Sequence, residues 1–393
     1  MCIRSLLTAC AVLLSSSVAL ADTRYSAVLT GAQEAPPNAT PALGNGTLIL
    51  NTAENSVTVS ADYFNLSGPP TVAHVHGPAD PGASAPPIIT LSPLPGTSTG
   101  VIAPQVQAVT PGEVADIKAG RWYFNIHTMN FGGGEIRGRI VAHEPRFTGF
   151  LSADQEVPAI NSPSARGFGS ILLNDAETSV DIVLSFAGLG SAQVMSHIHA
   201  PALPNGNSGV AIDIGTAPGA VTQGEIRVTR AISRLQLAQM RAGLAYFNVH
   251  SSTFASGEIR AQVRPGMPVF AAFEGRQHVP ANVTSGRGLF RLYLDYPRIR
   301  GFGEITITNM ATQITTMSLH GPALPGASGA LIPPPIPFPP GQTSFRVVNV
   351  PISLSVAEVG GYFSGLLYAQ VNSDTASSQI RGQIDGLMQD GSE

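Results

Sequence analysis

The feature that most constrains this chain is a set of short motifs that recurs three times in the same order. A Gln-x-x-Pro motif begins at Gln33, Gln155 and Gln277, at a spacing of 122 residues. A motif ending in His-Gly-Pro or His-Ala-Pro, a strand-like segment and an Ile-Arg motif follow in each copy. A period of about 120 residues has the size of a domain, whereas solenoid units have roughly 20–50 residues. The chain therefore predicts tandem domains rather than a repeat array.

The domain boundaries are expected where proline and glycine interrupt the pattern, near Glu144-Pro145 and Pro265-Gly266. A chain of 393 residues is long enough for two to four domains of ordinary size. The predicted divisions are a signal peptide at residues 1–21, two domains at 22–145 and 146–267, and a divergent third domain at 268–393.

Within one copy the hydrophobic pattern is that of short β-strands. Trp122, Phe124 and Ile126 alternate with more polar residues, as in a strand with one buried face. The 42 glycines and 32 prolines disfavour long helices and are typical of turns between strands. One short helix per copy is predicted from capping boxes at Thr110–Glu113, Ser233–Gln236 and Ser355–Glu358. The pattern predicts an all-β fold, with each domain an antiparallel sandwich of about seven to nine strands.

The first residues have the composition of a secretory signal peptide. Arg4 provides a basic start, an apolar stretch follows, and Ala19-Leu20-Ala21 fits a cleavage site. Both cysteines, Cys2 and Cys10, lie in this segment, so the mature chain is expected to have no disulfide. No later apolar run reaches the roughly 20 residues of a membrane span. We expect a secreted, periplasmic or cell-surface protein, cleaved near Ala21.

The charge composition excludes two classes of partner. Charged residues make up 12% of the chain, the formal net charge is −4, and Lys118 is the single lysine. Binding to nucleic acid or to anionic lipid needs a basic surface, which this composition does not supply.

Most of the histidines lie at the repeated motifs. His74 and His76 belong to one predicted strand and point to the same face. His127 lies on another strand, which a glycine-rich turn joins to the segment that carries Glu135 and Arg137. If these segments form a hairpin, His127 faces Glu135 and Asn125 faces Arg137, and we expect all of these side chains on one face. The second copy repeats this set as His197, His199, His250, Glu258, Asn248 and Arg260.

Two interpretations of this cluster remain open. The histidines could bind zinc or copper, with Glu135 and Glu258 as ligands or as groups that orient the imidazoles. Alternatively, His–Glu and Asn–Arg hydrogen bonds could form a structural polar network that needs no cofactor. The structural network is the favoured interpretation of the pattern alone.

The third copy lacks most of this set. It has Ser318 in place of the first histidine, Asn372 in place of the third and Gln379 in place of the glutamate, while His320 and Arg381 remain. The proline-rich segment 333–340 is expected to replace a strand. The third domain is therefore predicted to be a scaffold or a contact surface.

No catalytic site is predicted. Glu34 and Glu156 could act as acids or bases, but a residue in that position before proline more often caps a turn. Serine-elbow, phosphate-loop and dinucleotide motifs are absent from the sequence.

The repeated motifs together resemble the CHRD domain, named after chordin, and the resemblance extends over the three copies with the third divergent. It implies an Ig-like β-sandwich or barrel and an extracytoplasmic location. The predicted function is that of an exported, non-enzymatic binding or surface-structural protein whose partner is an extracellular protein or matrix component. The alternative is a zinc- or copper-binding protein with sites in domains 1 and 2, with superoxide-dismutase-like activity as an open option.

Overall fold

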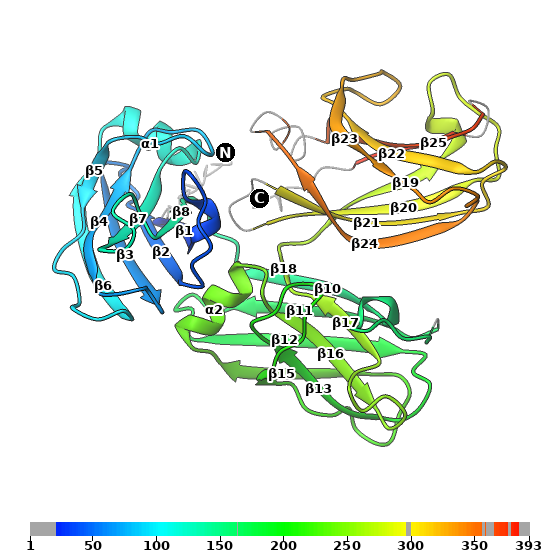
Figure 1. Cartoon of the computed structure of the whole chain (residues 1–393), viewed down its shortest axis with the longest axis horizontal. Coiled ribbons are helices and arrows are strands. Elements are labelled where there is room, and N and C mark those ends of the chain that lie inside the picture. Colours follow the sequence, from blue (N-terminus) through cyan, green and yellow to red (C-terminus); the bar gives the residue numbers. More distant parts are fainter. Residues whose placement is uncertain are drawn as a thin grey trace, which may run out of the picture.

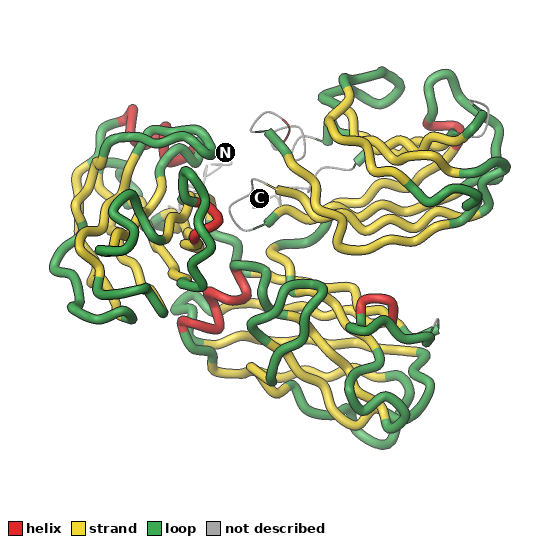
Figure 2. The backbone as a smooth tube through the Cα atoms, viewed as in Figure 1, coloured by secondary structure: helices red, strands yellow, loops and turns green. Residues whose placement is uncertain are grey.

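The computed structural model describes residues 21–162, 164–295, 300–355, 358, 365–375 and 379–384. Within these residues the chain forms three antiparallel β-sheets, with nine, nine and eight strands (Figures 1 and 2). Each predicted domain range supplies the strands of one sheet. The predicted all-β fold is confirmed. The predicted signal peptide, with both cysteines, lies outside the described residues except for Ala21.

The elements of the three sheets follow the same sequence. The first sheet contains β1 (Thr23–Thr30), β2 (Leu43–Leu50), β3 (Ser56–Phe64), β4 (Pro70–His76), β5 (Pro87–Thr90), β6 (Gly100–Ala108), β7 (Tyr123–Thr128), β8 (Ile136–Arg139) and β9 (Val141–Ala142). The second contains β10 (Arg146–Ser152), β11 (Arg166–Leu173), β12 (Ser179–Ala187), β13 (Gln193–His199), β14 (Val210–Asp213), β15 (Gly224–Ala231), β16 (Tyr246–Ser251), β17 (Ile259–Gln262) and β18 (Arg264–Pro265). The third contains β19 (Val269–Glu274), β20 (Arg287–Leu294), β21 (Arg300–Thr308), β22 (Ile314–His320), β23 (Leu331–Pro337), β24 (Phe345–Ser353), β25 (Tyr368–Ser373) and β26 (Ile380–Gln383).

The strand order shows that the three domains share one topology. In the first sheet the order is β5-β4-β7-β8-β1-β2-β3-β6, and the other two sheets repeat it strand for strand. The strand β8 pairs with β1 at Thr30 and Arg137, and β9, the next segment of the chain, continues this ladder at Ser26–Val141 and Tyr25–Ala142. Trp122, Phe124 and Ile126 are fully buried in the core of the domain, as the alternation predicted. Strands β4 and β7, which carry the histidines, are neighbours in the sheet.

Two α-helices are found in the described residues, α1 (Pro111–Lys118) and α2 (Arg234–Arg241). Both begin with the predicted capping boxes, at Thr110 and Ser233. One short 3-10 helix follows the first strand of each domain: η1 (Gly31–Gln33), η2 (Ala153–Gln155) and η3 (Gly275–Gln277). The third predicted helix falls mostly outside the described residues. In this part of the chain no helix has the length and apolar character needed to cross a membrane.

The prediction for the proline-rich segment was wrong. Residues Leu331–Pro337 form the strand β23, although three of them in a row are prolines. The strand lies at the end of its sheet and pairs with β22 alone. Proline is tolerated there because an edge strand leaves one side of its backbone free of ladder hydrogen bonds.

The first two domains meet at a buried cluster of charged groups. Glu177 of domain 2 is fully buried and forms ion pairs with Arg241, Arg234 and Arg24. The last of these arginines belongs to domain 1. Arg234, at the start of α2, also pairs with Asp62 of domain 1 at 2.6 Å. Figure 1 shows α2 on the side of the second domain that faces the first. The second and third domains are joined by further contacts, including Arg346 with Asp154 at 2.5 Å.

Replacement of Glu177 tests whether this cluster fixes the two domains. In Glu177→Gln the three arginines lose their shared anion, and breaking a buried ion pair typically costs about 3–5 kcal/mol. We expect a lower free energy of unfolding and a larger radius of gyration in small-angle X-ray scattering. Asp181→Asn, which removes an exposed charge from the same domain, is the control. Equal scattering curves for all three proteins would contradict this account.

The same interface predicts an acid sensitivity. Burial lowers the pKa of His143 to about 4, and the Arg241 guanidinium adds to the effect. As the pH falls from 6.5 to about 4, the unfolded chain takes up a proton on His143 before the folded chain does, so stability declines. Urea unfolding should show that wild type loses stability over this range more steeply than His143→Gln. Parallel curves for the two proteins would refute the prediction.

Candidate metal centre

The structure brings the three histidines of domain 1 together on adjacent strands. His74 and His76 alternate along β4, and His127 lies on the neighbouring strand β7. One ligand atom from each ring lies within 4.8 Å of the other two. The ring centroid of His74 is 5.2 Å from that of His76 and 5.6 Å from that of His127. The shared face of His74 and His76 was predicted from the sequence, whereas the pairing of β4 with β7 was not.

Backbone carbonyls fix two of these rings with one nitrogen toward the cluster. The Nδ1 of His76 lies 2.9 Å from the carbonyl of Ala85, and the Nδ1 of His127 lies 3.1 Å from that of Gly132. A carbonyl is an acceptor, so each Nδ1 carries the proton and each Nε2 has a free lone pair. Among the described residues, these Nε2 atoms and the Nδ1 of His74 have no hydrogen-bond partner although they are buried. Such unpaired buried groups are uncommon in native proteins.

Domain 2 repeats the arrangement with His197, His199 and His250. The Nδ1 of His199 donates to the backbone carbonyl of Ser208 at 3.0 Å, and the Nδ1 of His250 donates to the backbone carbonyl of Ala255 at 3.0 Å. The Nε2 of His250 lies 3.3 Å from the Nδ1 of His197. The two triads, His74, His76 and His127 and His197, His199 and His250, are the histidine groups of this kind in the described residues.

Burial favours the neutral form, which is the form that binds metals, in several of these imidazoles. Burial lowers the pKa of His74 and of His76 below the usual 6.5. In domain 2, burial lowers the pKa of His250 to about 4, although its hydrogen bond to Ala255 acts in the opposite direction. Because a metal competes with protons for the imidazole lone pair, a low pKa keeps that lone pair available at neutral pH.

Domain 3 has the same strands but closes the cluster with hydrogen bonds. The Nε2 of His320 lies 2.9 Å from the Ser318 hydroxyl, and the Asn372 amide donates to the same hydroxyl at 3.3 Å. The Nδ1 of His320 still faces a carbonyl, that of Gly329. Thus His320, the equivalent of His76 and His199, has a hydrogen-bonded Nε2 in the copy where its two neighbours are not histidines.

A stack of side chains explains why this histidine is present in every copy. The ring of His76 packs parallel to Tyr123 with centroids 5.0 Å apart, and the guanidinium of Arg137 covers the same tyrosine ring at 3.5 Å. His199, Tyr246 and Arg260 repeat the stack in domain 2, and His320, Tyr368 and Arg381 repeat it in domain 3. The shared histidine therefore has a packing role in addition to any role in a cluster.

The structure does not bring Glu135 to the histidines. The β7–β8 pairing contains Asn125 opposite Arg137 but ends at Ile126 and Ile136, one pair short of the predicted contact. The Glu135 carboxylate is fully buried and accepts hydrogen bonds from the hydroxyls of Thr40, Ser67 and Thr128 and from the Ser67 amide. Glu258 likewise accepts from Ser162 and Gly190. Both glutamates anchor loops, so the expectation that they join the cluster was wrong.

The role of Glu34 and Glu156, the glutamates of the Gln-Glu-x-Pro motif, was not predicted from the sequence. Asn125 and Asn248 each face a buried glutamate, Glu34 and Glu156, and Arg137 and Arg260 act on these same carboxyls. Burial raises the pKa of both glutamates to about 7, although the arginines and asparagines oppose the shift. The repetition of Gln-Glu-x-Pro in the first two copies, with His278 in the third, was the available signal.

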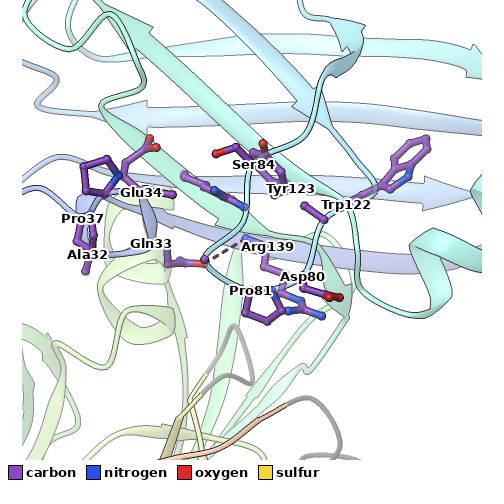
Figure 3. A pocket seen from close by; sticks show the side chains of 15 residues that line it. Ala32, Gln33, Glu34, Pro37, Asp80, Pro81, Ser84, Trp122, Tyr123 and Arg139 are labelled. Carbon is purple, nitrogen blue, oxygen red and sulfur yellow. Dashed lines mark hydrogen bonds between the residues drawn. The ribbon is translucent and has the colours of Figure 1, made fainter.

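Glu34 lines a pocket of about 490 Å³ beside the stack. Tyr123, Arg137, Arg139 and Asp80 also line it. In Figure 3, Glu34 and Trp122 lie at opposite sides of this pocket, and the dashed line joins Gln33 to Arg139. The backbone amide of Arg139 donates this hydrogen bond to Gln33 at 3.1 Å. Acidic, basic and aromatic groups are mixed in the pocket, so its lining does not favour one class of ligand.

Comparison with known protein families agrees with the repeat analysis. The CHRD domain matches residues 25–140 and 147–263, which together make up more than half of the chain. The chain belongs to the CHRD family. Its third segment has the topology of the two matched CHRD domains and is a divergent copy. A search of curated proteins found no match. The CHRD domain suggests an extracellular binding or structural role.

Replacement of Glu135 separates the structural carboxylate from the histidine cluster. Burial raises the pKa of Glu135, but hydrogen bonds from Thr128, Ser67 and Thr40 outweigh burial and lower it. Glu135→Ala leaves these donors without an acceptor, and we expect a loss of roughly 2–4 kcal/mol in the free energy of unfolding. Glu135→Gln, which keeps the shape and one acceptor, should lose less. The NMR signals of the His74, His76 and His127 rings should be unchanged in both variants. A change of these signals in Glu135→Ala would contradict the conclusion that Glu135 is separate from the histidine cluster.

Proposed function

We propose that this CHRD protein is an exported, non-enzymatic binding protein whose first two domains each hold one zinc or copper ion. The ligands are His74, His76 and His127 in domain 1 and His197, His199 and His250 in domain 2. Its binding partner is an extracellular protein or matrix component, and domain 3 serves as a scaffold or contact surface. The proposal assigns no reaction to the chain.

The observation that carries the metal proposal is the contrast between His76 and His320. Both rings donate Nδ1 to a backbone carbonyl and stack on a tyrosine. In domain 3 the Nε2 is hydrogen-bonded to Ser318, whereas in domain 1, among the described residues, it has no partner and faces two other imidazoles. A structural polar network would be expected to pair these buried nitrogens. A metal ion would satisfy all three at once.

The chemistry of the donor set favours zinc or copper over harder ions. Three neutral imidazoles are suitable ligands for Zn²⁺ and Cu²⁺, whereas Ca²⁺ and Mg²⁺ prefer oxygen ligands. The backbone carbonyls of Ala85 and Gly132 would fix the ring orientation from outside, as partners of the second nitrogen commonly do in metal sites. Three protein ligands leave a coordination position for water or for a side chain of a partner.

Metal content of the purified chain tests the proposal. Protein prepared without a histidine tag and loaded with Zn²⁺ should contain close to two ions per chain by elemental analysis. His127→Ala should contain one, and the double variant His127→Ala/His250→Ala should contain none. His278→Ala, in domain 3, is the matched control because its side chain lies outside both clusters.

Stability provides a second readout of the same sites. A ligand that binds the folded state at 100 times its Kd adds about 2.7 kcal/mol to the free energy of unfolding. Zn²⁺ or Cu²⁺ should therefore raise the unfolding midpoint of wild type but not that of the double variant. A wild-type chain that stays metal-free in the presence of both ions, with an unchanged midpoint, would eliminate the metal proposal and leave the structural interpretation.

A further inference from the structure

The two histidine clusters have the same ligands but different neighbours on the adjoining strand. In domain 1, His74 of β4 pairs with Thr90 of β5. In domain 2, His197 of β13 pairs with Asp213 of β14. The two positions are equivalent by register, so the chain places a hydroxyl beside one cluster and a carboxylate beside the other.

The Asp213 carboxylate faces the nitrogen of His197 that points away from the cluster. Its Oδ1 lies 3.7 Å from the Nε2 of His197, and the Nδ1 of the same ring points toward His250. The side chain of Asp213 is two-thirds exposed, whereas that of His197 is 12% exposed. Because the carboxylate is exposed, a movement of about 0.7 Å, enough to reach hydrogen-bond distance, meets little steric resistance.

The position of the protons shows why this contact matters for a metal. His250 carries its proton on Nδ1, since that atom faces the Ala255 carbonyl. Without a metal, the Nδ1 of His197 donates its proton to the bare Nε2 of His250. A metal that binds both of these atoms requires the proton of His197 to be on Nε2. Asp213 faces this Nε2. Metal binding therefore replaces the hydrogen bond from His197 to His250 by a charge-assisted hydrogen bond from His197 to Asp213.

We propose that Asp213 is a positioning residue that makes the domain 2 cluster the higher-affinity of the two metal sites. The inference rests on the proposed function, because it assumes that both clusters bind an ion. Asp213 acts through His197: it accepts the Nε2 proton, holds the ring with Nδ1 toward the ion and strengthens that nitrogen as a ligand. Loss of such an outer carboxylate typically lowers metal affinity 10- to 100-fold. Thr90 cannot supply the negative charge in domain 1.

Single-site variants allow each affinity to be measured alone. His127→Ala leaves the domain 2 site and His250→Ala leaves the domain 1 site, and each is titrated with Zn²⁺ by calorimetry against a competing chelator. We expect the domain 2 site to bind roughly 10- to 100-fold more tightly. In the His127→Ala background, Asp213→Thr should abolish this advantage, and Asp213→Glu should retain most of it.

The reciprocal change distinguishes this role from a purely structural one. Thr90→Asp in the His250→Ala background should tighten the domain 1 site by about tenfold, a gain that damage to the fold cannot produce. If Asp213→Thr proves unstable, this gain decides the question alone. Equal affinities of the two sites, or a Thr90→Asp variant with unchanged affinity, would overturn the inference while two bound ions would still support the proposed function. A wild-type chain that binds no Zn²⁺ would overturn both.

Discussion

In each histidine cluster, a backbone carbonyl fixes the outer nitrogen of an imidazole and so directs the other nitrogen inward. In domain 1 this holds for His76 and His127, which come from neighbouring antiparallel strands. The pleat of the sheet places His74 on the same face. Three ring nitrogens then converge in a buried place that, in the described residues, offers them no hydrogen-bond partner. The rest of the domain supports the strands that hold these rings.

The polar residues around the cluster divide into separate groups. The histidines converge, whereas Glu135 ties the loop at Ser67 to the end of β7 through hydroxyl and amide donors. Glu34 faces Asn125 and interacts with Arg137, which covers the Tyr123 ring. The polar residues of the motifs therefore form three separate groups and not the single network expected from the sequence. This separation leaves the imidazole nitrogens without the carboxylate partners that a polar network would have given them.

Much of the fold could be predicted from the sequence because its determinants are local and repeated. Alternation at Trp122, Phe124 and Ile126 identified a strand, and the capping box at Thr110 identified α1. Parity along β4 and β13 gave two histidines of each triad, but the pairing of these strands with β7 and β16, which adds the third, was not predicted. Glu135 was misplaced because parity holds only while the ladder continues, and here it ends at Ile126. The partnership of Glu34 with Asn125, 91 residues apart, and the burial of Glu177 against three arginines depend on long-range packing that no local pattern encodes.

X-ray absorption at the zinc edge can show directly whether these nitrogens bind a metal ion. For the Zn²⁺-loaded chain, we expect a first shell with about three imidazole nitrogens at roughly 2.0–2.1 Å. The multiple-scattering pattern of imidazole should disappear in the variant that lacks His127 and His250. A first shell made of oxygen atoms alone, or a spectrum that is unchanged in the double variant, would contradict metal binding by the histidines.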